Sequence, residues 1–305
     1  MIGLLFPGQG AQEVGMGHAL AEAFPVARRT FDEANHALGY DLAKACFEGP
    51  ADMLTQTDVC QPAILATSIA AFRVAEEHGL RGELVMGHSL GEFTALVATG
   101  ALGFAEGLRL VAERGAAMHA AGEARPGTMA ALLGVDDDQA RALCEEAGDV
   151  WPANYNCPGQ VVASGTVDGV GRLVHLCADR KVRAAGLRVG GAFHSPLMAP
   201  AAERLLPALE AWQPREGTVP FLSTTTCRVE PPARMRAVLL AQLTSPVRFG
   251  DAVRAALDLG VTRFVELGPG KVLSGLVRRV VRDVALAQVG APDDIPSLAK
   301  IGTPA

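Results

Sequence analysis

A serine in a glycine-flanked turn is the strongest candidate for chemistry in this chain. Ser89 is the central residue of Gly-x-Ser-x-Gly at 87–91, which follows an apolar run at 84–86 and precedes a helix-like segment at 93–98. This order of strand, tight turn and helix is typical of a nucleophile elbow, which exposes a serine hydroxyl beside unpaired N–H groups at a helix N-terminus. The pattern predicts a nucleophilic Ser89, with an ordinary turn residue as the alternative.

A nucleophilic serine needs a base, and histidine is the most common one. His194 lies in the glycine-rich loop 190–196 after a predicted strand, a position where catalytic groups concentrate. The other histidines lie on helix-like segments, except His88, which is adjacent to Ser89 in the turn. We therefore predict a Ser89–His194 pair, although spacing alone does not show that the two residues meet.

Two further features could serve such a pair. The apolar segment 2–6 runs into Pro-Gly-Gln-Gly at 7–10, which would bring backbone amides to the carboxyl edge of a sheet, where α/β proteins bind ligands. A simple connecting turn is the alternative. On the predicted helix 104–120 we place Arg114 on the polar face with Arg109, where a solvated side chain is the ordinary interpretation.

Hydrophobic periodicity predicts the elements that would position these residues. Strands and helices alternate over most of the chain, whereas 128–190 has the strand-helix-strand-strand-helix-strand order of a ferredoxin-like unit. We predict an α/β fold, with an α/β-hydrolase-like core that contains a parallel sheet and the nucleophile elbow. The core is assigned to 1–126 and 191–290, the inserted ferredoxin-like small domain to 127–190, and a loose C-terminal tail to 291–305.

Composition excludes several classes of function. The 305 residues carry a formal net charge of −6 without a long basic run, so we expect no nucleic-acid partner. The six cysteines are scattered and form no metal-ligand spacing, so we expect buried thiols in a reducing compartment and no metal. No apolar stretch is long enough for a bilayer and no signal peptide is evident, so we expect a cytoplasmic protein without membrane contact.

Seven motifs resemble, in order and over almost the whole chain, those of the malonyl-CoA:acyl-carrier-protein transacylases, including the freestanding trans-acting acyltransferases of polyketide synthases. They are Phe-Pro-Gly-Gln-Gly-Ala-Gln at 6–12, Gln-Pro-Ala at 61–63, Gly-His-Ser-Leu-Gly-Glu at 87–92, Arg-Gly at 114–115, Asn-Cys-Pro-Gly-Gln at 156–160, Phe-His-Ser at 193–195 and Val-Glu-Leu-Gly-Pro-Gly-Lys at 265–271.

The resemblance implies roles for named residues. Ser89 is the nucleophile, and His194 is the general base and acid. The backbone amides of Gln9 and Leu90 form the oxyanion hole. A carbonyl near Gln242 orients the imidazole in place of a carboxylate.

The resemblance also implies a substrate with a terminal carboxylate. Arg114 matches the family's carboxylate clamp, for which a guanidinium is suited because it donates two parallel hydrogen bonds. Gln61, Phe193 and His88 are expected to contact the substrate. Phe193 resembles the malonyl-selective pattern, whereas Gly191 departs from a polyketide pattern that often has histidine there, which leaves selectivity among malonyl-type extenders open.

The implied activity is ping-pong transfer of malonyl from malonyl-CoA to the phosphopantetheine thiol of an acyl carrier protein, in fatty acid or polyketide biosynthesis. No metal or redox cofactor is expected, and the protein is expected to be a monomer. Basic side chains at Arg180, Lys181, Arg183 and Arg188, or at Arg278, Arg279 and Arg282, could steer an acidic carrier. The alternatives are a hydrolase that clears carrier proteins, a transferase for a substituted malonyl group, and a non-catalytic docking module.

Overall fold

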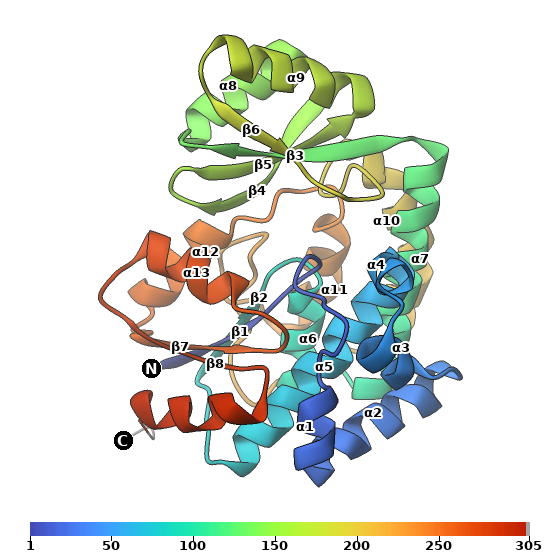
Figure 1. The fold of residues 1–305 in the computed structure, drawn as a ribbon, viewed down its shortest axis with the longest axis vertical. Coiled ribbons are helices and arrows are strands. Elements are labelled where there is room, and N and C mark those ends of the chain that lie inside the picture. Colours follow the sequence, from blue (N-terminus) through green and yellow to red (C-terminus); the bar gives the residue numbers. More distant parts are fainter. Residues whose placement is uncertain (303–305) are drawn as a thin grey trace.

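The structure, a computed structural model, describes residues 1–302. Its larger part is built on a parallel sheet with the strand order β2-β1-β7-β8 (Figure 1). The strands are β1 (Ile2–Phe6), β2 (Leu84–Gly87), β7 (Arg263–Leu267) and β8 (Ala285–Val289). Leu5 of β1 pairs with Met86 on one side and Glu266 on the other, so all three strands end at the same edge. The loop after β1 and the turn after β2 therefore meet there.

Both faces of this sheet are covered by helices. Leu4 belongs to a core cluster with the helices on one face, whereas Leu5 packs into a second cluster with those on the other face, as alternation along a strand requires. The helices of the larger part are α1 (His18–Ala23), α2 (Pro25–Leu38), α3 (Leu42–Glu48), α4 (Ala51–Thr55), α5 (Thr57–Glu77), α6 (Gly91–Ala98), α7 (Phe104–Ala124), α10 (Ala199–Ala211), α11 (Pro232–Ala241), α12 (Phe249–Asp258) and α13 (Val272–Val280), with the short 3-10 helix η1 (Pro196–Met198).

A second sheet, also of four strands, is inserted between α7 and η1. Its strands are β3 (Gly127–Leu133), β4 (Val150–Cys157), β5 (Gln160–Thr166) and β6 (Arg183–Gly186), all antiparallel in the order β4-β5-β3-β6. Helices α8 (Asp137–Ala147) and α9 (Val167–Asp179) lie on the side away from the larger part (Figure 1).

Backbone hydrogen bonds join the edge strand β4 to the larger part. Tyr155 N–H donates to the Val247 carbonyl at 2.8 Å, and Val247 N–H donates to the Ala153 carbonyl at 2.8 Å. The α/β class and its parallel sheet are thus confirmed, and the inserted segment has the predicted order of strands and helices.

The predicted loose tail is wrong for residues 291–302. Residues Pro292–Lys300 form the 3-10 helix η2, which packs against β8, a strand that the periodicity did not indicate. The carboxylate of Asp294 accepts the N–H groups of Gly290 and Ala291, each at 2.9 Å, and Arg263 donates to the Ile301 carbonyl at 2.7 Å. Residues 303–305 of the predicted tail lie outside the described part of the chain.

Within residues 1–302, no helix is both long enough and apolar enough to cross a bilayer.

Candidate active site

The turn after β2 holds Ser89 in a left-handed backbone conformation, with φ at 54°. Glycines make this turn possible because it presses against the loop after β1. A Cβ on Gly91 would lie 2.0 Å from the Phe6 carbonyl oxygen, and one on Gly8 would lie 2.3 Å from the His88 carbonyl oxygen. The strand, turn and helix predicted around Ser89 are therefore packed directly onto the first glycine-rich loop.

Ser89 and His194, 105 positions apart, are brought into contact. The Ser89 hydroxyl lies 2.7 Å from Nε2 of His194, and Nδ1 of His194 lies 2.8 Å from the backbone carbonyl oxygen of Gln242, just after α11. Because a carbonyl only accepts, Nδ1 carries the proton and Nε2 is free to accept from the serine. This is the geometry of a nucleophile and its oriented general base.

The electrostatic surroundings keep His194 neutral. Burial lowers the pKa of His194 to about 3, and the positive charge of Arg114 contributes to the shift. The hydrogen bond to the Gln242 carbonyl acts in the opposite direction but does not outweigh burial. At neutral pH the imidazole is therefore unprotonated and able to take a proton.

Arg114 is 1% exposed and points at the nucleophile. Its Nη2 donates to Ser89 Oγ at 3.1 Å and to Gln242 Oε1 at 2.8 Å, while Nη1 donates to Gln61 Oε1 at 2.7 Å. Within residues 1–302 its Nε–H is buried and has no partner. Burial lowers the pKa of Arg114 to about 10, which still leaves a cation at neutral pH.

The placement of Arg114 on a polar helix face is wrong. Arg114 is three residues after Val111 and four before Met118, and both of these are buried, so the three share the inner face of α7. Arg109, by contrast, reaches the Ala37 carbonyl at the surface. A buried cation on that face is held by the amides of Gln61 and Gln242 rather than by solvent.

Ser89 lines a cavity of about 90 Å³. Its lining contains Gln9, Leu90 and Phe193, in addition to Arg114 and His194. Within residues 1–302, the backbone N–H groups of Gln9 and Leu90 have no hydrogen-bond acceptor. Both predicted oxyanion donors thus border the nucleophile with their N–H groups unused.

A second cavity, of about 210 Å³, adjoins the first and is bordered by Leu273 and Leu276 at α13. The two cavities share the lining residues Gln9, His88, Asn154 and Leu187. Nε2 of His88 lies 2.9 Å from Oδ1 of Asn156, and burial lowers the pKa of His88. His88 therefore joins the elbow to strand β4 as a neutral ring in the wall that the two cavities share.

The predicted substrate residues differ in position. Phe193 is 6% exposed and lines the smaller cavity, whereas Gln61 is not part of that lining and lies behind Arg114, which it holds. Sequence reasoning missed Glu92, a fully buried carboxylate, and the side chain of Gln242. The single charged residue in the buried-looking segment 91–98 was the available signal for Glu92.

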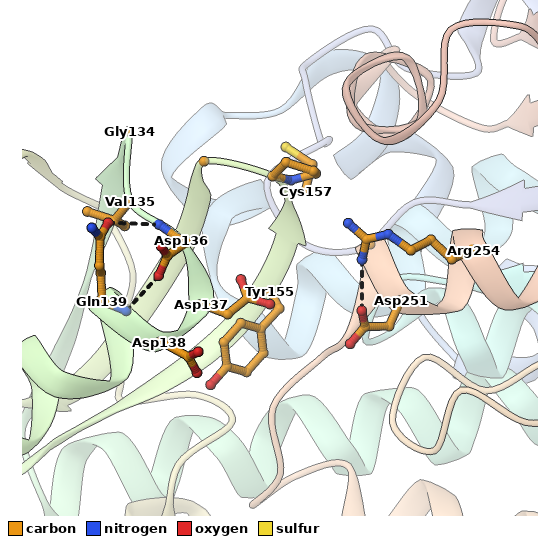
Figure 2. A pocket seen from close by; sticks show the side chains of 13 residues that line it. Gly134, Val135, Asp136, Asp137, Asp138, Gln139, Tyr155, Cys157, Asp251 and Arg254 are labelled. Atoms are coloured by element: carbon orange, nitrogen blue, oxygen red, sulfur yellow. Dashed lines mark hydrogen bonds and ion pairs between the residues drawn. The ribbon is translucent and has the colours of Figure 1, made fainter.

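A larger hollow of about 690 Å³ lies elsewhere, between the start of α8, strand β4 and α12 (Figure 2). The polar side chains in its walls are bonded to one another: Asp136 and Gln139 cap α8 reciprocally, and Asp251 is paired with Arg254 at 2.8 Å. None of Ser89, His194 or Arg114 lines it. The chemistry is therefore assigned to the smaller, enclosed cavities and not to this hollow.

Comparison with known proteins agrees with this geometry. The model of the acyl transferase domain family matches residues 4–303. The malonyl CoA-acyl carrier protein transacylase of Bacillus subtilis is 44% identical over 300 residues, which cover 96% of this chain and 95% of the relative. The Escherichia coli K12 protein of the same name is 40% identical over 294 residues, covering 94% and 95%.

Solved structures are similar throughout. The malonyl-CoA:acyl carrier protein transacylase of Xanthomonas oryzae superposes with a TM-score of 0.96 at 39% identity, covering 99% of this chain and 98% of that one. A malonyl-transacylase in complex with a type II polyketide synthase acyl-carrier protein superposes with a TM-score of 0.94 at 37% sequence identity, covering 99% of each chain. The chain belongs to the acyl transferase domain family.

Proposed function

We propose that this protein transfers malonyl from malonyl-CoA to the phosphopantetheine thiol of an acyl carrier protein, through an ester on Ser89. The names of its relatives support this reaction. The observation that carries it is the position of Arg114: a buried guanidinium 3.1 Å from Ser89 Oγ meets an acyl group whose far end is a carboxylate. An acetyl group offers that buried cation no counter-charge.

The first half-reaction acylates the serine. Ser89 Oγ attacks the thioester carbonyl carbon while Nε2 of His194 takes the hydroxyl proton, and a tetrahedral oxyanion forms. The unpaired N–H groups of Gln9 and Leu90 donate to that oxyanion. Its collapse breaks the carbon–sulfur bond, His194 returns the proton to the sulfur, and coenzyme A leaves as a thiol.

The second half-reaction runs the same steps with the carrier's thiol. His194 takes the thiol proton as the sulfur attacks the ester carbonyl, and the same N–H groups hold the oxyanion. Collapse breaks the bond to Ser89 Oγ, which receives the proton from His194. Atoms and charges balance without a metal or a redox cofactor, so none is proposed.

The passage that runs from Ser89 to α13 is proposed to hold the phosphopantetheine arm. Arg279 on α13 donates to Gln160 Oε1 at 2.8 Å, and Gln160 lines the outer cavity. In the other basic cluster, Arg180 is already paired with Glu146 at 2.6 Å. The cluster of Arg278, Arg279 and Arg282 is therefore the preferred site for an acidic carrier or the coenzyme phosphates.

Selectivity for unbranched malonyl is proposed from the size of the inner cavity. Phe193 shares its wall with Met118 and Met129, and only about 90 Å³ is left. An α-methyl group would have to displace one of these side chains, which typically costs about 1–3 kcal/mol.

We also infer the finer fold assignment. The β4-β5-β3-β6 order and the strand-helix-strand-strand-helix-strand sequence support a ferredoxin-like small domain at 127–190. The left-handed Ser89 between β2 and α6 supports an α/β-hydrolase-like elbow in the domain formed by 1–126 and 191–290.

Intact-mass measurement tests the proposed function. The protein is mixed with malonyl-CoA and then chased with a holo acyl carrier protein, beside Ser89→Ala as the control. A malonyl adduct that is absent from Ser89→Ala and passes to the carrier is the expected result. An adduct lost to water instead would favour the hydrolase, and no adduct with any acyl-CoA would overturn the covalent mechanism.

A further inference from the structure

Glu92, in the first turn of α6, is a fully buried carboxylate that takes no part in the steps above. Its Oε1 accepts hydrogen bonds from Ser223 Oγ at 2.9 Å, from Thr224 N–H at 2.5 Å and from Thr224 Oγ1 at 3.0 Å. Its Oε2 accepts from Gln242 Nε2 at 2.6 Å. The Ser223 hydroxyl, the Thr224 N–H and the Gln242 amide each donate to the carboxylate. The Thr224 hydroxyl has a single proton and also lies 3.0 Å from the Gly87 carbonyl oxygen, so it donates to one of these two acceptors at a time.

The side-chain amide of Gln242 joins this carboxylate to the substrate clamp. Its Nε2 donates to Glu92 and also to the Ser89 carbonyl at 2.9 Å, while its Oε1 accepts from Nη2 of Arg114 at 2.8 Å. An anion at the nitrogen end and a cation at the oxygen end permit only one orientation of the amide. With the amide flipped, its NH₂ would face the guanidinium and its oxygen would face the carboxylate.

We propose that Glu92 is a positioning residue for malonyl recognition: by fixing the Gln242 amide, it holds the Arg114 guanidinium where the terminal carboxylate of the acyl group must bind. This inference rests on the proposed function, because it concerns the same Arg114. Glu92 does not itself reach the substrate cavity, whose lining does not include it.

Glu92 also affects the charge of the clamp. Burial raises the pKa of Glu92, and the hydrogen bonds from Thr224, Ser223 and Gln242 reduce that rise without cancelling it. The negative charge of Glu92 in turn raises the pKa of Arg114 against the effect of burial. The carboxylate thus helps keep the clamp charged while the site is empty, without occupying the guanidinium edge that the substrate needs.

Glu92→Gln is the sharpest change because it keeps the size of the side chain. Whichever way the new amide is turned, its NH₂ faces a donor, either Thr224 N–H or the Gln242 NH₂ group. The orientation that keeps the Thr224 N–H bonded places the new oxygen at the Oε1 position and turns the NH₂ toward Gln242. Gln242 is then released or flipped, and Arg114 loses its fixed acceptor. The substitution should therefore penalise acyl groups that depend on Arg114 and spare those that do not.

The experiment compares Ser89 acylation by malonyl-CoA and acetyl-CoA, measured as kcat/KM for each in the full-length protein. The two thioesters share coenzyme A, so any change in coenzyme A binding alters both kcat/KM values alike and leaves their ratio unchanged. We expect Glu92→Gln to lower the malonyl-to-acetyl ratio by about tenfold or more, since a charged hydrogen-bonded contact is weakened. Arg114→Gln should lower the ratio as well. Combining it with Glu92→Gln should lower the ratio little further, because both substitutions act on the same contact.

Glu266→Gln is the matched control. Glu266 is also a fully buried carboxylate that accepts two donors, the N–H groups of Leu273 at 3.0 Å and Ser274 at 2.7 Å, but it contacts no residue of the Arg114 network. It should lower the melting temperature while leaving the ratio within about twofold of wild type. If Glu92→Gln does not fold, Ser223→Ala removes one donor from Glu92 and should lower the ratio by about two- to fivefold.

The positioning role is overturned if Glu92→Gln folds and keeps the wild-type ratio. It is also overturned if only Ser223→Ala folds and that variant keeps the wild-type ratio. Equal falls in Glu92→Gln and Glu266→Gln overturn it too. These results differ from failure of the proposed function, in which the wild-type protein itself forms no malonyl ester or passes none to the carrier.

Discussion

The imidazole of His194 is oriented by a main-chain group: its Nδ1 lies 2.8 Å from the carbonyl oxygen of Gln242. The side chain of Gln242 serves a separate purpose, since it contacts Arg114 and the Ser89 carbonyl. One residue thus aligns the base through its backbone and the carboxylate clamp through its amide. A side-chain substitution at 242 removes only the second of these contacts directly.

Replacement of the base should slow the reaction without unfolding the protein. His194 has φ at 57°, a conformation that asparagine tolerates better than most residues, so His194→Asn is the preferred variant. Asparagine cannot take the Ser89 proton, and we expect single-turnover release of coenzyme A to slow by about 10²–10⁴-fold. Circular dichroism should remain that of wild type, and an unchanged release rate would exclude His194 as the base.

The pH dependence of acylation should reflect the neutral His194. With its pKa lowered to about 3 by burial and by Arg114, the acidic limb of kcat/KM for the free enzyme should lie well below pH 6.5. Arg114→Gln removes the positive charge, so the His194 pKa rises and the limb moves to higher pH. Measurement uses acetyl-CoA for both proteins, and a limb that stays in place or moves down would contradict this account.

Stability should also depend on this histidine. Because the His194 pKa is lower in the folded state, the unfolded chain binds the proton first as pH falls through about 6.5. Between about pH 6.5 and about pH 3, the free energy of unfolding therefore falls as the pH falls, by up to about 1.4 kcal/mol per pH unit. Urea unfolding at pH 7 and pH 5 should show a smaller loss for His194→Asn than for wild type, whereas equal losses would refute the assignment.

Close packing beneath the elbow predicts a large effect from one methyl group. Gly91→Ala would place Cβ 2.0 Å from the Phe6 carbonyl oxygen, a main-chain atom that cannot move away, and should cost about 3 kcal/mol or more. Gly171→Ala, inside α9 with open space around it, should instead stabilise by about 0.5–1 kcal/mol. Chemical unfolding of both variants distinguishes this packing argument from a general preference for alanine in helices.

A charge reversal on α13 should weaken carrier recognition. Arg279 is hydrogen-bonded to Gln160, which lines the outer cavity. We expect Arg279→Glu to raise the KM for the carrier several-fold, or about 1 kcal/mol, with little change in kcat. Arg28→Glu, an exposed charge on α2, is the control and should leave KM unchanged. Arg183→Glu tests the other basic cluster, and an effect there alone would move the docking surface to β6.

Local sequence patterns predicted the parts of the site that depend on local backbone. The glycines around Ser89 and the loop that contains His194 are visible because tight turns restrict residue type. That these two residues meet, and that a carbonyl near Gln242 completes the pair, depends on contacts between segments 105 and 48 positions apart. Residue type and loop position predicted the Ser89–His194 pair without showing that the two residues meet, whereas the role of the carbonyl near Gln242 came from the family resemblance alone.

Arg114 and Glu92 show a different limit. Because charged residues are normally solvated, Arg114 was predicted on the polar face of its helix. Its spacing from Val111 and Met118 instead indicated the buried face, on which the structure places it. Each burial is possible because the other residue and the intervening amides compensate it. Strand β8 and helix η2 were missed because β8 is stabilised by pairing with β7 and η2 by packing against β8, which a local pattern does not reveal.

The paired hydrogen bonds between β4 and Val247 have a mechanical consequence. Val247 is five residues beyond Gln242, so the loop that orients His194 is bonded to strand β4 at one end and, through the Gln242 amide, to the Ser89 carbonyl at the other. If the inserted sheet shifts relative to the larger part, either both β4–Val247 bonds break or the loop moves with the sheet. In the second case the Gln242 carbonyl moves too, so a displacement of this sheet changes the alignment of the imidazole over only five residues of chain.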